Sequence, residues 1–120
     1  MGQEDFVGLL IAASSRLQSA YQKVLNEWGP EEPPITILFA ALGDQIAEDF
    51  DRAGVDANRR VFSLIEQAME SDDKGLVTAV ATGLIEALVT RAVRTESLWK
   101  EMAPFLGPRS RHHAEAWLAP

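Results

Sequence analysis

The sequence has no cysteine at any of its 120 positions. This absence excludes disulfide bonds, thiolate zinc sites and cysteine nucleophiles, and it is typical of a protein that works in a reducing compartment. The sequence also lacks the H-E-x-x-H zinc motif, a glycine-rich phosphate loop and the G-x-S-x-G nucleophile motif. We therefore expect a protein that is not an enzyme, with no catalytic residue, no cofactor and no metal site.

Basic residues are scarce in the first two fifths of the chain. Residues 1–51 hold nine acidic and two basic residues, whereas residues 52–120 hold nine of each, so the net charge of −7 belongs to the first stretch. Such a surface repels phosphates, which argues against nucleic acid as a partner and favours a basic protein. An acidic surface that only keeps the protein soluble is the alternative.

Signals for export or membrane insertion are also missing. The first residues, MGQEDF, are acidic and lack the basic segment of a secretory signal. The only stretch apolar enough to span a membrane is 75–93, and it contains Glu86 and Arg91, whose charges are costly in lipid. We expect a cytoplasmic protein without a membrane partner.

No segment has the alternating pattern of a β-strand. Apolar residues recur instead at three- and four-residue steps, which indicates helices. The pattern predicts an all-α fold, a single domain over residues 1–120 built as a bundle of five or six helices. The predicted helices cover about 4–28, 34–52, 56–70, 72–94 and 95–103, and a last helix begins near Pro108.

The stretch from Lys74 to Arg94 is predicted to form the central helix, at about 72–94, because apolar residues occur on all of its sides. Its polar residues recur at every fourth position, so they form a slanting row that drifts by about 40° at each step. Gly83 has no side chain, and a neighbouring backbone can come close there. The polar row consists of Lys74, Thr78, Thr82, Glu86, Thr90 and Arg94.

Glu86 lies near the middle of this row and is the first candidate site. A buried acid can transfer protons or bind a metal. As a structural charge it would need a partner, because an unpaired buried charge is expensive. Three arginines are candidates for that partner: Arg59, Arg60 and Arg91. Because no other catalytic side chain lies nearby, we interpret Glu86 as a buried structural charge.

The second candidate site is acidic. Asp44, Glu48 and Asp51 lie opposite the apolar stripe of the predicted helix 34–52. A second acidic group precedes that helix and consists of Glu27, Glu31 and Glu32. We predict that these six residues bind a protein partner. A solvated face is the alternative, and so is a metal site, although carboxylates on one exposed helix face rarely converge on one ion.

His112 and His113 are the only histidines. Adjacent residues on a helix point about 100° apart, so the two cannot share one metal as an i, i+4 pair would. Together with Arg109 and Arg111 they predict a small basic surface patch. The pattern is compatible with a place in the core or at an interface for all three tryptophans, Trp28, Trp99 and Trp117.

Several short stretches between residues 38 and 118 carry a resemblance to a family. They are Leu42-Gly43-Asp44, Ile65-Glu66, Ser71-Asp72-Asp73, Gly83-Leu84-Ile85-Glu86, and Leu106-Gly107-Pro108 followed by Trp117. In these stretches the chain resembles small, acidic, all-helical bacterial proteins of unassigned function. Some of those proteins look like the immunity partners of polymorphic or contact-dependent toxins.

The resemblance implies an intracellular binding protein that neutralises a toxin without a cofactor. Many toxin domains in such systems are basic nucleases, and an acidic protein can cover a site that is built for phosphates. The expected mechanism is steric and electrostatic occlusion, with contacts from the acidic residues named above. A self-associating helical protein with a structural or adaptor role, for example a homodimer, is the alternative function.

Overall fold

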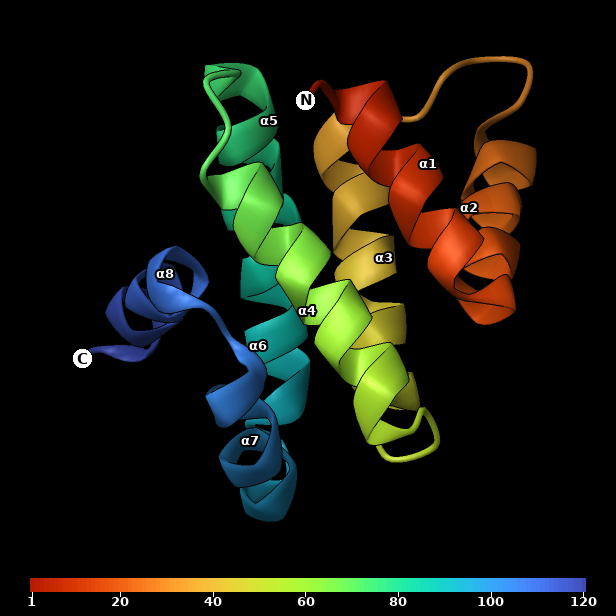
Figure 1. Cartoon of the computed structure of the whole chain (residues 1–120). Coiled ribbons are helices and arrows are strands. Elements are labelled where there is room, and N and C mark those ends of the chain that lie inside the picture. The colour runs from red at the N-terminus through yellow and green to blue at the C-terminus, as the bar shows by residue number, and fades with distance from the viewer.

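Helices hold 79% of the residues in the computed structural model, which describes all 120 residues and contains no strand (Figure 1). The predicted all-α fold is confirmed. The number of helices is seven rather than five or six, with the continuous helix from Lys74 to Ala92 counted as one. The elements are α1 (Gln3–Ala13), α2 (Ser15–Trp28), α3 (Ile35–Asp49), α4 (Val55–Met69), α5 (Lys74–Thr78), η1 (Ala79–Ile85), α6 (Glu86–Ala92), α7 (Glu96–Met102), the short 3₁₀ turn η2 (Ala103–Phe105) and α8 (Pro108–Leu118).

The additional helix arises at Ser14, where the predicted helix 4–28 breaks into α1 and α2. Ser14 has extended backbone angles, φ −155° and ψ 126°, and its Oγ accepts a hydrogen bond from the backbone N–H of Leu17 at 3.3 Å. A serine that caps a helix in this way ends one helix and begins the next. The apolar spacing continues across the break, so the prediction of one helix was wrong.

The central helix is confirmed, and it consists of α5, η1 and α6 end to end. Its η1 and α6 segments pack against α3, and the helix also contacts α4, α7 and α8. Figure 1 shows α4 crossing in front of it, with α1 and α2 on one side, α8 on the other and α7 at its lower end. Its first cap is Asp73, whose Oδ1 accepts from the N–H of Leu76 at 3.1 Å. Lys74–Ala92 is long and apolar enough to cross a membrane, but 56% of that span is buried inside the fold.

The middle segment η1 is a π-helix, and α3 approaches it most closely there. A Cβ atom built on Gly83 would lie 3.3 Å from the carbonyl oxygen of Thr36. Gly83 therefore admits a neighbouring backbone, as its position predicted. The hydroxyl of Thr82 donates to the carbonyl oxygen of Thr78 at 2.7 Å, a bond that competes with the backbone ladder of an α-helix. The sequence pattern contained no sign of the π-helix.

A single apolar core joins all the helices. Phe6 of α1 packs against Phe39 of α3, with the ring centroids 5.7 Å apart. Further along, Phe50 lies 6.0 Å from Phe62 and 5.3 Å from Phe105, in edge-on arrangements that favour aromatic pairs. These contacts connect the C-terminal end of α3 to the middle of α4 and to η2. The core thereby holds the connections between helices in place.

Candidate functional site

Glu86 contacts α8 rather than an arginine. Its Oε2 lies 2.8 Å from Nε2 of His113, and the two side chains keep 20% and 29% of their surface exposed. None of the three candidate arginines, Arg59, Arg60 and Arg91, is its partner, and Glu86 is only partly buried. Only the tertiary fold brings α8 back to the central helix, 27 residues further along the chain. Glu86 positions α8, and it does not set how α4 meets the central helix.

Thr90, the next residue of the polar row after Glu86, also contacts α8. The indole N–H of Trp117 donates to Oγ1 of Thr90 at 3.1 Å, and Trp117 remains 50% exposed. His113 is half-buried while His112 is exposed, so the two histidines are not equally part of the predicted basic surface patch. Of the other tryptophans, Trp28 is 37% exposed and Trp99 packs partly against the core.

Two of the six predicted partner-binding acids, Asp44 and Glu48, form ion pairs within the fold. Arg91 of α6 contacts Oδ2 of Asp44 at 3.1 Å and Oε2 of Glu48 at 3.7 Å. These two carboxylates thus stabilise the packing of α3 on α6 and are partly neutralised within the fold. The helical wheel placed them correctly on the polar side of α3, but it could not show that Arg91 lies opposite.

The remaining acids of that set lie at opposite ends of α3. Glu31 and Glu32 precede this helix and Asp51 follows it, and 15 residues of α-helix span about 22 Å. Glu27 lies in the last turn of α2, 4.0 Å from Lys23. Glu31 and Glu32 belong to a second group of acids, which the fold assembles from three parts of the chain.

That group is an acidic end of the molecule, where the α2–α3 connector, the N-terminus and the α4–α5 turn meet (Figure 1). Its members are all exposed, and none of them forms an ion pair. We define the acidic end as Glu4, Asp5, Glu31, Glu32, Glu70, Asp72 and Asp73. Seven unpaired carboxylates in one region produce a strongly negative potential.

Contacts between distant segments hold the acidic end together. The hydroxyl of Ser71, in the α4–α5 turn, donates to the carbonyl oxygen of Met1 at 3.0 Å. The N–H of Gly2 donates to Oδ2 of Asp5 at 3.1 Å, and this bond caps the first turn of α1. The sequence analysis did not group these acids, because their proximity depends on contacts across 70 residues.

An apolar groove opens within the acidic end, between α1, α2 and the start of α3. Its volume is about 490 Å³, and Glu4 and Glu32 both line it. The floor is apolar and includes Val7, Ile11, Tyr21, Leu25, Ile35 and Leu38. Apolar floors with charged margins are the usual arrangement at protein interfaces. This groove can accept an apolar side chain from a partner whose surrounding residues are basic.

Nowhere in the structure do three or more histidine, aspartate or glutamate side chains lie close enough to hold a metal ion. No buried polar side-chain atom lacks a hydrogen-bond partner. The groove and its carboxylates offer apolar and anionic contacts to another molecule.

Comparison with known proteins places the chain in a family. A family model described as a domain of unknown function (DUF7674) matches residues 7–119. No curated protein and no solved structure matches the chain.

Proposed function

The chain belongs to the DUF7674 family, and we propose that it is a binding protein that neutralises a basic protein toxin by covering the toxin with its acidic end. The proposed mechanism is occlusion in the cytoplasm, and it needs neither catalysis nor a cofactor. The observation that carries the proposal is the apolar groove with Glu4 and Glu32 at its margin.

Electrostatics supports a basic partner. The whole chain has a net charge of −7, and the acidic end contains seven carboxylates, none of which forms an ion pair. A basic surface relieves their mutual repulsion and is drawn toward them from a distance of about one Debye length, about 8 Å at physiological salt. Such attraction raises association rates and selects against acidic partners.

The groove favours a specific complex over non-specific electrostatic binding. Binding energy at interfaces comes mostly from a few apolar or aromatic side chains that fill a desolvated pocket. Here the pocket floor is built from three helices. Ile35 in this floor is 36% exposed, and Trp28 at the end of α2 is 37% exposed. An apolar anchor flanked by lysine or arginine fits this surface.

The double substitution Glu31→Lys/Glu32→Lys is expected to weaken binding of the basic partner at least about tenfold at low salt, because it removes two attractive charges and adds two repulsive ones. At about 0.5 M salt the difference should shrink, since screening reduces surface electrostatics. The partner is first identified as the product of a neighbouring gene or by co-purification from the native host. Calorimetric titration of each variant then measures the affinity, and survival of cells that express the toxin measures protection.

The matched control is Asp51→Lys/Glu101→Lys, which makes the same change in net charge outside the acidic end. Both residues are exposed and take part in no ion pair. We expect this control to bind with nearly unchanged affinity. Equal weakening by both double variants would mean that only the net charge matters, and unchanged binding by both would remove the acidic end from the interface.

A second candidate function is self-association, and one observation favours it. A shallow groove between α3 and the central helix is lined by Ile37 and Trp117, which are 46% and 50% exposed. Large exposed apolar side chains on one face are typical of interfaces. Light scattering separates the two functions, because a homodimer predicts twice the mass of 13.2 kDa and a concentration-dependent equilibrium. A monomer at all working concentrations would contradict self-association.

A further inference from the structure

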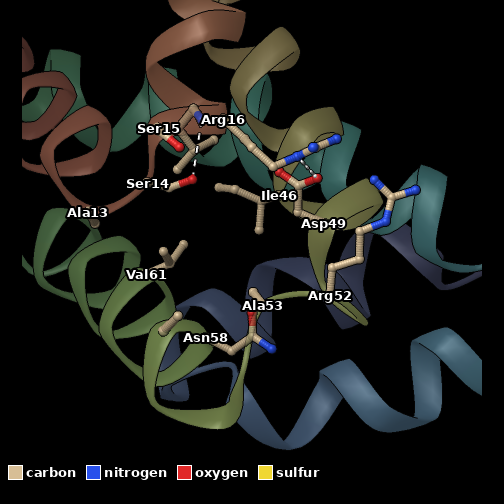
Figure 2. A pocket seen from close by; sticks show the side chains of 12 residues that line it. Ala13, Ser14, Ser15, Arg16, Ile46, Asp49, Arg52, Ala53, Asn58 and Val61 are labelled. Carbon is tan, nitrogen blue, oxygen red and sulfur yellow. Dashed lines mark hydrogen bonds and ion pairs between the residues drawn. The ribbon is translucent and has the colours of Figure 1, made fainter.

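A separate cavity lies at the opposite end of α3 from the acidic end. It has a volume of about 340 Å³, is partly open to solvent and is bordered by the α1–α2 corner, the end of α3 and the start of α4 (Figure 2). Pockets for small molecules begin at about 300 Å³. Half of the lining is apolar, and the wall includes Ala13, Leu17, Ile46, Ala57 and Val61. A compact aliphatic group fits such a wall.

Two arginines supply the cavity with hydrogen-bond donors that the protein itself leaves unused. Nε of Arg16 donates to Oδ1 of Asp49 at 2.7 Å, and the other oxygen of Asp49 accepts from Nε2 of Gln45 at 2.9 Å. The terminal amino groups of Arg16 have no protein partner, and the guanidinium of Arg52 has none at all. Figure 2 shows both guanidinium groups on the same side of the cavity. Two cations and one carboxylate leave this margin positive in an acidic protein.

A buried acceptor completes the lining. Asn58 is only 7% exposed, and its Nδ2 donates to the carbonyl oxygen of Phe50 at 3.0 Å. Its Oδ1 has no protein partner, and because no fully buried side-chain oxygen is left unpaired, this atom is accessible at the cavity wall. An amide oxygen in that position accepts a hydrogen bond from a ligand hydroxyl or N–H.

We propose that this cavity binds a small organic acid with a branched aliphatic body and one hydroxyl group. The carboxylate pairs with Arg52 and with the free amino groups of Arg16, since guanidinium groups match carboxylates in a fork geometry. The aliphatic body packs against Ile46 and Val61, and the hydroxyl donates to Oδ1 of Asn58. Inorganic phosphate would leave the apolar wall unfilled. The inference does not depend on the proposed toxin partner.

The test titrates the full chain with 2-hydroxy-4-methylpentanoate and follows methyl resonances by NMR. We expect saturable binding in the millimolar range or tighter, with shifts at Leu17, Ile46 and Val61, which line the cavity. The neutral 2-hydroxy-4-methylpentanamide should bind at least about tenfold more weakly, because hydrogen bonds to a charged group are the stronger ones. No saturation with the acid, or equal affinity for the amide, would overturn the proposal.

Two single variants test the assigned residues. Arg52→Gln should weaken binding of the acid about tenfold, whereas Arg59→Gln, which changes the same charge on an exposed arginine outside the cavity, should leave it unchanged. Ala57→Leu fills the cavity and should abolish binding. Equal effects of the two arginine variants would overturn the assignment. If Ala57→Leu does not fold, the arginine pair still decides, because neither arginine side chain holds a contact of the fold.

Discussion

Replacing Gly43 by alanine is expected to lower the free energy of unfolding by about 3 kcal/mol or more, which is the upper range for overpacked cores. The added methyl group on Gly43 would overlap the carbonyl oxygen of Leu84, a backbone atom that cannot rotate away as a side chain can. Because interiors are close-packed, α3 and η1 would have to separate. Urea denaturation followed by circular dichroism measures the loss.

The control is Gly8→Ala in α1, where an added Cβ meets nothing within 4 Å. Alanine has a higher helix propensity than glycine, so this variant should be more stable by up to about 1 kcal/mol. The two glycine substitutions therefore have opposite expected signs. A Gly43→Ala protein as stable as the unmodified chain would show that α3 and η1 are not in close contact.

Replacing Glu66 by alanine is expected to lower the free energy of unfolding by about 2–3 kcal/mol. The carboxylate of Glu66, on α4, accepts three hydrogen bonds from the first turn of α8: from the N–H of Arg109 and of Ser110, both at 3.0 Å, and from Oγ of Ser110 at 2.8 Å. A carboxylate at a helix N-terminus also interacts favourably with the helix dipole. Without it, Ser110, which is fully buried, would lose its partner.

Hydrogen exchange gives the more specific measurement, because α8 should lose protection before the rest of the bundle. Glu70→Ala is the matched control on the same helix, since Glu70 is exposed and its side chain makes no hydrogen bond or ion pair. That variant should change stability by less than about 0.5 kcal/mol. Similar losses for both substitutions would contradict a docking role for Glu66.

Apolar spacing was sufficient to predict most helices because burial follows local periodicity. The predicted helix 56–70 corresponds to α4, and the predicted range 72–94 contains the whole central helix. Spacing failed at Ser14 because apolar residues keep their period there while one side chain caps a new helix. Single hydrogen bonds of this kind decide where a helix ends, and composition does not record them.

The candidate site was only partly predictable. The excess of acidic residues near the start of the chain was evident, and Glu31 and Glu32 were identified. Asp44 and Glu48 were assigned to the same surface, although Arg91 pairs with both of them. The other members of the acidic end lie far apart in the sequence, and no local pattern indicates that they are neighbours in space.

The sequence by itself determined the all-helical class, the central position of the stretch around Lys74–Ala92 and the negative charge of the protein. These properties depend on residue type and on spacing within one helix. The tertiary structure alone decided which charges remain unpaired, why α3 and η1 touch at Gly43, and which carboxylates hold α8. Those outcomes depend on distances between atoms from remote segments, such as Glu66 and Ser110, and such distances exist only after the helices pack.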